Sequence, residues 1–181
     1  MQTTAKKQAV PVWDPFVRIF HWSLVIGVLA NFFVVDDGET VHQWLGYTVT
    51  TLVLARIVWG FVGTRHARFA DFFPTPARVR RHLADLASGR RDFHAGHNPL
   101  GALMMLALIG LVLSLGVTGY MQGMDAYWGE EWLQDLHEGI ATGLIGLAGL
   151  HALAAIVMSR LERVNLVKAM ITGVKVREGE V

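Results

Sequence analysis

Two histidines, His137 and His151, lie fourteen residues apart in an otherwise apolar run that extends from Leu136 to Ala155. On an ideal α-helix, fourteen residues advance the chain by about 21 Å and complete almost four turns, so both imidazoles leave the same face. Polar side chains inside the hydrocarbon layer of a membrane cost free energy and usually serve a function. The spacing therefore indicates two imidazole sites about one bilayer leaflet apart.

Two further histidines match these depths on other predicted helices. His21 lies just inside the first apolar run, at the depth of His151. His42 opens the second run, at the depth of His137, so the four histidines form two level pairs. Facing imidazoles can bind a metal, relay protons or fill both axial positions of a haem. A bare zinc or iron site needs further carboxylate or thiolate ligands, and the only nearby acids are Glu138 and loop residues. A porphyrin already provides four nitrogen ligands, so the pattern favours haem.

Four apolar runs must position these histidines. They cover about residues 15–35, 41–63, 99–121 and 136–159, and each is near the ~20 residues that an α-helix needs to cross a bilayer. Hydrophobic residues make up 52% of the 181 positions, which is more than a water-soluble chain of this length normally buries. The expected fold class is an all-α membrane protein, a four-helix transmembrane bundle forming a single domain over residues 1–181.

The connection from 64 to 98 is the only long one, and we expect a short amphipathic helix in it, within residues 76–89. Helix starts are marked where a capping side chain precedes a proline, at Asp14, Thr75 and Asn98. Four histidines fall in this connection, and we expect them to be surface residues: His66, His82, His94 and His97. The chain has no cysteine, which excludes disulfides, iron–sulfur clusters and covalently attached haem.

The charge pattern predicts the orientation in the membrane. The 64–98 connection carries seven arginines against three aspartates, and both chain ends are also basic. The two short connections are purely acidic, with Asp36, Asp37 and Glu39 in one and Asp125, Glu130, Glu131 and Asp135 in the other. The positive-inside rule then places both termini and the long connection in the cytoplasm.

Two further residues of the second apolar run bear on a bulky planar ligand. Arg56 follows His42 by fourteen residues, so it leaves the same helix face at the depth of the inner histidine pair. Haem propionates would be its natural counter-ions; alternatively, its side chain extends to the inner headgroups. Gly46 lies one turn after His42 and leaves room for a macrocycle, although small residues also promote close helix packing.

The motifs "FHW", "HQWLG", "ARIVWG", "HNPLG" and "HEGIATGLIGLAGLH" follow one another along nearly the whole chain. In this order they resemble the bacterial cytochrome b561 family, which includes the related cytochrome b subunits of nickel-iron hydrogenases. The resemblance implies two non-covalent haem b groups with bis-histidine ligation. It assigns His21 and His151 to the inner haem and His42 and His137 to the outer one.

The resemblance also implies electron transfer in the bacterial inner membrane between the quinone pool and a redox partner, such as a periplasmic cytochrome. Because both axial positions are filled, the haem irons would have no open site for a substrate. Two alternatives remain open: a haem-bearing membrane anchor and electron conduit of a larger oxidoreductase, and a haem-free metal or proton transporter. Membrane lipid is an expected partner and nucleic acid is not.

Overall fold

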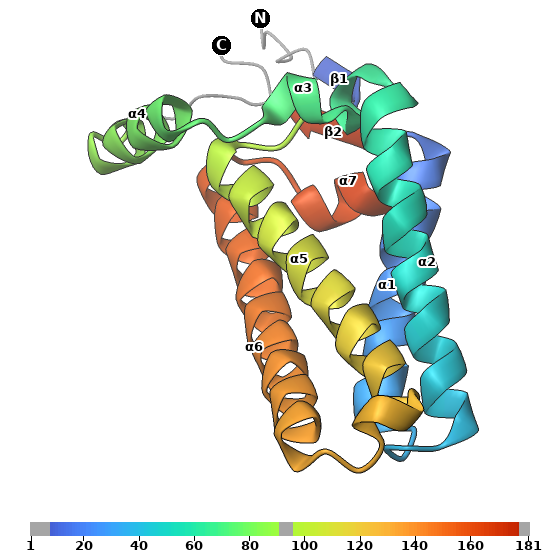
Figure 1. The fold of residues 1–181 in the computed structure, drawn as a ribbon. Coiled ribbons are helices and arrows are strands. Elements are labelled where there is room, and N and C mark those ends of the chain that lie inside the picture. Colours follow the sequence, from blue (N-terminus) through green and yellow to red (C-terminus); the bar gives the residue numbers. More distant parts are fainter. Residues whose placement is uncertain (1–7, 91–95, 178–181) are drawn as a thin grey trace, which may run out of the picture. The chain divides into compact units, whose positions relative to one another are not determined.

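The computed structural model describes residues 8–90 and 96–177, which are mainly helical (Figure 1). The four long helices are α1 (Pro15–Phe33), α2 (Thr40–Val62), α5 (Pro99–Gln122) and α6 (Glu131–Leu161). Each is long and apolar enough to cross a membrane. Large apolar side chains also remain exposed along these helices, among them Ile26, Phe61, Tyr120 and Leu153. Helices that are apolar all round suit a lipid environment, in agreement with the predicted all-α membrane fold class.

Shorter elements connect and flank the long helices. They are β1 (Gln8–Pro11), η1 (Arg65–Ala67), α3 (Phe69–Phe72), α4 (Pro76–Ala87), η2 (Asp125–Tyr127), α7 (Leu166–Thr172) and β2 (Val174–Arg177). Helix α4 is the amphipathic helix predicted in the long connection. The strands and α7 were not predicted, because elements of four to seven residues are too short to show a clear hydrophobic period.

The three proline-marked helix starts are confirmed as caps. The Asp14 carboxylate accepts a hydrogen bond from the backbone amide of Val17 at 2.9 Å. The backbone amide of Arg78 likewise donates to the Thr75 hydroxyl at 3.3 Å, and the backbone amide of Gly101 donates to the Asn98 side-chain oxygen at 2.7 Å. Each cap satisfies a backbone donor that has no partner within its own helix.

The chain divides into two compact units, and one of them contains His42 and His137. This unit, named here the paired-histidine unit, comprises Ile19–Val58 and Met105–Gly149, so segments of all four long helices contribute to it. Its core is aliphatic and is formed by Val49, Val53, Val112 and Leu144.

Two glycines allow the helices of this unit to approach closely. A Cβ atom at Gly27 would lie 2.8 Å from the Val49 side chain, and one at Gly116 would lie 2.6 Å from the Thr50 hydroxyl. Close backbone approach at small residues is typical of helix packing in membranes.

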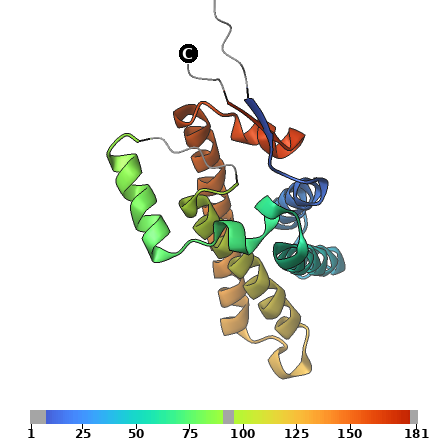
Figure 2. The same cartoon turned by 90° about the horizontal axis from the view of Figure 1, so that it is seen from above.

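The other unit, named here the terminal unit, comprises Met1–Arg18, Trp59–Met104 and Leu150–Val181. Strands β1 and β2 pair antiparallel in it, with Pro11 opposite Val174, and α7 lies next to β2 (Figure 2). The Gly173 carbonyl accepts hydrogen bonds from the amides of Val12 and Trp13 at 2.8 and 3.0 Å. With φ at +84° and the Trp13 carbonyl 2.6 Å from where a Cβ would lie, position 173 requires glycine.

Asp14 connects three segments of the terminal unit. Besides capping α1, its carboxylate accepts hydrogen bonds from the Trp59 indole at 3.0 Å and the Thr64 hydroxyl at 2.6 Å. Burial raises the pKa of Asp14, but these hydrogen bonds favour the charged form and bring the pKa below its ordinary value of 3.8. The ionised carboxylate is therefore part of the folded structure of this unit.

Candidate haem-binding site

The imidazole rings of His42 and His137 lie close together within the paired-histidine unit. His42 lies in the first turn of α2 and His137 in the second turn of α6, and their ring centroids are 6.3 Å apart with an interplanar angle of 60°. Two imidazoles bound to opposite sides of one metal, with bonds of about 2 Å, have centroids about 6 Å apart. The spacing therefore suits two axial ligands of one iron.

A hydrogen bond to one nitrogen of His137 leaves the other nitrogen able to bind a metal. The Thr118 hydroxyl of α5 lies 2.7 Å from Nδ1 of His137, so that nitrogen is in a hydrogen bond. A Cβ atom at Gly119 would lie 3.3 Å from Cε1 of the same ring. The hydrogen bond occupies Nδ1, which leaves Nε2 as the nitrogen that can bind a metal.

His42 is held less firmly than His137. Its Nδ1 atom is buried and has no hydrogen-bond partner within the described residues. The Asp37 carboxylate lies 3.6 Å from this nitrogen, beyond hydrogen-bond distance, and the Asp37 side chain is 96% exposed. A buried nitrogen without a partner costs free energy unless it binds something else.

The donor set fits haem better than a bare metal ion. Among residues 8–90 and 96–177, no three histidine, aspartate or glutamate side chains gather in a group that could hold a metal ion. Zinc and non-haem iron sites need three or four protein ligands. Two imidazoles are sufficient only when the remaining ligands come with the metal, as they do in a porphyrin.

Asn31 is a polar residue of this region that the sequence patterns did not single out. It lies on α1, and apart from the adjacent residues and backbone of α2, its Nδ2 atom is the only group of the described residues within 4 Å of a Cβ built at Gly46. Its Oδ1 atom is buried and has no hydrogen-bond partner within the described residues. The space beside Gly46 is thus open, with an amide at its edge, as expected for a position that accommodates a ligand.

The guanidinium of Arg56 is inside the protein. Its side chain is only 2% exposed, and Nη2 lies 3.9 Å from the sulfur of Met105. Burial of this kind argues against the alternative that Arg56 extends to the membrane headgroups. Its role as a partner of haem propionates stays a prediction.

The second predicted pair is divided between the two units. His21 belongs to the paired-histidine unit, where its ring makes an edge contact with Trp22 at a centroid distance of 5.3 Å. His151 belongs to the terminal unit. Both side chains are half-buried, and their pairing around an inner haem stays a prediction.

Three of the four histidines in the long connection lie in the described part of the chain. His66 lies 3.0 Å from the Asp71 carboxylate. The His97 ring packs between Trp13 and Phe72, with centroid distances of 4.7 and 4.8 Å. His82 is buried, with 7% exposure, so the prediction that it is a surface residue was wrong. His94 lies outside the described residues.

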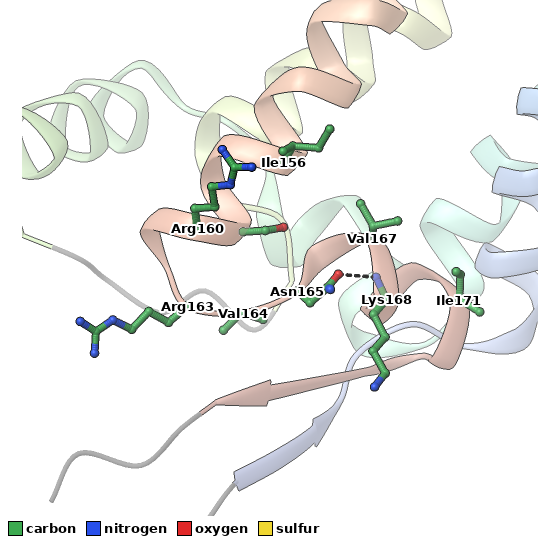
Figure 3. A pocket seen from close by; sticks show the side chains of 9 residues that line it. Ile156, Arg160, Arg163, Val164, Asn165, Val167, Lys168 and Ile171 are labelled. Carbon is green, nitrogen blue, oxygen red and sulfur yellow. Dashed lines mark hydrogen bonds between the residues drawn. The ribbon is translucent and has the colours of Figure 1, made fainter.

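A hollow of about 500 Å³ lies between the end of α6 and α7 (Figure 3). Three cations and several aliphatic side chains line it, but Arg160, Arg163 and Lys168 point in different directions in this view. One small anion could therefore not contact all three in this arrangement. The hollow therefore has a basic rim but no single position where the three cations converge.

Four apolar helices with an imidazole pair between two of them are the architecture of a membrane cytochrome b. The model of the prokaryotic cytochrome b561 family matches residues 12–173, and the chain belongs to this family. It is accordingly a haem b electron-transfer protein of the bacterial inner membrane that passes through the bilayer several times. A haem-free transporter is not favoured.

The chain is also similar to curated proteins named probable Ni/Fe-hydrogenase B-type cytochrome subunit. The relative from Azotobacter vinelandii is 24% identical and that from Azotobacter chroococcum mcd 1 is 26% identical, each over 93% of this chain and 89% of the relative. A relative from Rhodobacter capsulatus is 24% identical over 96% of this chain and 84% of its own length. No solved structure matches the chain.

Proposed function

We propose that this cytochrome holds two haem b groups per chain and transfers electrons between quinone and a protein redox partner. His42 and His137 would be the axial ligands of the outer haem, and His21 and His151 those of the inner haem. The 6.3 Å separation of the His42 and His137 rings is the observation that carries this proposal. The spacing of fourteen residues between His137 and His151 on one helix extends the proposal to a second haem.

The residues of the chain determine which chemistry is possible at this site. A bound haem supplies a one-electron couple. His42 on α2 and His137 on α6 would hold the haem from two different helices, and the chemistry that it would supply there is one-electron transfer. Arg56 would favour the reduced state of a nearby haem through its positive charge. The role of these residues would be to hold and tune the haem.

The proposed orientation has both termini in the cytoplasm. It is supported by the arginine-rich connection between α2 and α5 and by the acidic residues of the two short connections. The pairing of β1 with β2 supports the part of this proposal that puts both ends on the same side of the membrane, and the charge pattern selects the cytoplasmic side. When fused after Val181, a reporter enzyme that works only in the cytoplasm should be active, and one that works only in the periplasm should be inactive. Activity of the periplasmic reporter would contradict the orientation.

Reduction by quinol is the experiment that tests this function. Purified protein is mixed anaerobically with a reduced quinone analogue, and the absorbance of reduced haem b is followed with time. We expect haem reduction, with dithionite giving the maximum in the same sample. Oxidised quinone serves as the control and should reduce nothing.

A second candidate function is an electron conduit that anchors a larger oxidoreductase. The names of the similar proteins favour it, since they describe cytochrome subunits of Ni/Fe-hydrogenases. In that case the isolated protein would be reduced by dithionite but not by quinol. The same experiment therefore separates the two candidates.

A further inference from the structure

Thr118 and His137 share a short hydrogen bond inside the paired-histidine unit. The Thr118 side chain on α5 is only 7% exposed, and its Oγ1 atom lies 2.7 Å from Nδ1 of His137 on α6. Oγ1 also lies 2.9 Å from the carbonyl oxygen of Ser114 and 3.3 Å from that of Leu115. The hydroxyl thus contacts two carbonyl oxygens and one imidazole nitrogen.

The number of protons in this group decides the direction of each hydrogen bond. A hydroxyl has one proton to donate and two lone pairs with which to accept, whereas a carbonyl oxygen only accepts. If the hydroxyl proton goes to the Ser114 carbonyl one turn earlier, the oxygen accepts a hydrogen bond from Nδ1–H of His137. A neutral imidazole with its proton on Nδ1 has an unprotonated Nε2, which is the form that binds a metal.

We propose that Thr118 is a positioning residue, which holds His137 in the Nδ1–H form and presents Nε2 to the iron of the outer haem. This inference rests on the proposed ligation of that haem by His137. The adjacent Gly119 contributes by leaving space, since a side chain there would press on the imidazole ring. The other ligand, His42, has no such partner within the described residues, so Thr118 would set the properties of this haem from one side.

The hydrogen bond should also affect the reduction potential. An imidazole that donates from Nδ1 is a more basic ligand, and a more basic ligand stabilises ferric iron. Removing the hydroxyl should therefore make the outer haem easier to reduce. Given the usual free energy of a single hydrogen bond, we expect about a threefold change in its reduction equilibrium. For a one-electron couple this corresponds to about 28 mV, since a tenfold change is 59 mV.

The test compares Thr118→Val, which keeps the shape of the side chain, with Thr118→Ser, which keeps the hydroxyl. Thr51→Val is the matched control, because the Thr51 hydroxyl also bonds a carbonyl one turn earlier, that of Tyr47 at 2.8 Å, but is exposed. The readouts on purified protein are haem content, an optical redox titration and the low-spin ferric signal in electron paramagnetic resonance.

We expect Thr118→Val to raise one of the two potentials and to change one ferric signal, while Thr118→Ser and Thr51→Val behave as wild type. If Thr118→Val loses haem, restoration by Thr118→Ser still supports the role of the hydroxyl. The proposal is overturned if the valine variant has unchanged potentials and signals, or if serine fails to restore what valine loses. The ligation itself is tested separately by His137→Ala: if this variant keeps both haems, His137 is not a ligand and the function proposed for it fails as well.

Discussion

Histidines occur in two different surroundings in this molecule, one in each compact unit. In the paired-histidine unit, the rings of His42 and His137 have their centroids 6.3 Å apart, a spacing that suits the proposed shared haem. In the terminal unit, His97 packs against Trp13 and Phe72. The two clusters therefore differ in one respect that bears on the proposed ligation: among the described residues of these clusters, only His42 and His137 lie beside a second imidazole.

Buried cations show a similar contrast. Lys175 in the terminal unit is 4% exposed, donates a hydrogen bond to the Gly96 carbonyl at 2.9 Å and lies 5.9 Å from the Trp13 ring centroid. Burial lowers the pKa of Lys175 from its ordinary value, and Glu162 partly opposes this effect. These contacts connect β2 to other segments of its own unit. Arg56 instead lies in the paired-histidine unit, near Met105.

The largest expected effect separates the two histidine clusters directly. His42→Ala or His137→Ala should lose the outer haem, so the haem content should fall from two per chain to one. His97→Ala should keep both haems, because its ring has a packing role. Haem is counted by pyridine haemochrome absorbance relative to protein concentration. Full dihaem content in the His42 and His137 variants would remove the distinction between the clusters.

A smaller effect is expected from filling the close helix contact in the paired-histidine unit. Gly116→Leu should destabilise the protein by about 1–3 kcal/mol, because Thr50 leaves no room for the side chain. Gly110→Leu on the same helix is the matched control, since apart from the adjacent residues and backbone of α5, no atom of the described residues lies within 4 Å of its Cβ position. Thermal loss of the haem absorbance in detergent measures both. Equal stability of the two variants would show that α2 and α5 do not pack closely at Gly116.

Arg56 tests whether charge in the paired-histidine unit reaches a haem. Arg56→Gln should lower the potential of the inner haem by an amount on the order of 1 kcal/mol, because a nearby positive charge favours the reduced state. The outer haem, about 20 Å away by the helix rise, should change much less. An optical redox titration resolves the two haems. Two unchanged potentials would mean that Arg56 has only a packing role.

Asp14 provides the matching experiment in the terminal unit. Asp14→Asn should cost about 1 kcal/mol of stability and leave both haem spectra unchanged, because a neutral amide accepts hydrogen bonds more weakly than a carboxylate. The pKa of Asp14 in the folded protein is lower than its ordinary value of 3.8. Its contribution to the free energy of unfolding is therefore complete above pH 3.8 and is lost as the pH falls through the folded-state pKa. The wild type should therefore lose its advantage over the variant in acid. An equal advantage at every pH would contradict the role of the charged carboxylate.

Much of this architecture could be predicted from sequence because the signals were local. Apolar runs of membrane length marked the four long helices, and a polar residue before proline marked three helix starts. The proximity of His42 and His137 was expected from their level positions in two runs, and their role as haem ligands stays a prediction. In contrast, Thr118 resembles any threonine bonded to the turn before it. Its contact with His137 depends on how α5 packs against α6, which the local sequence does not contain. The β1–β2 pairing joins the two ends of the chain and was missed for the same reason.

The central claim, ligation of haem by imidazole pairs, is tested most directly on the purified wild-type protein. Pyridine haemochrome absorbance counts the haem b groups, and near-infrared magnetic circular dichroism of the ferric protein reports which side chains occupy the axial positions. We predict two haem b groups per chain, both low-spin and both with two imidazole ligands. A single haem per chain, or a haem with water or a thioether as an axial ligand, would contradict the account.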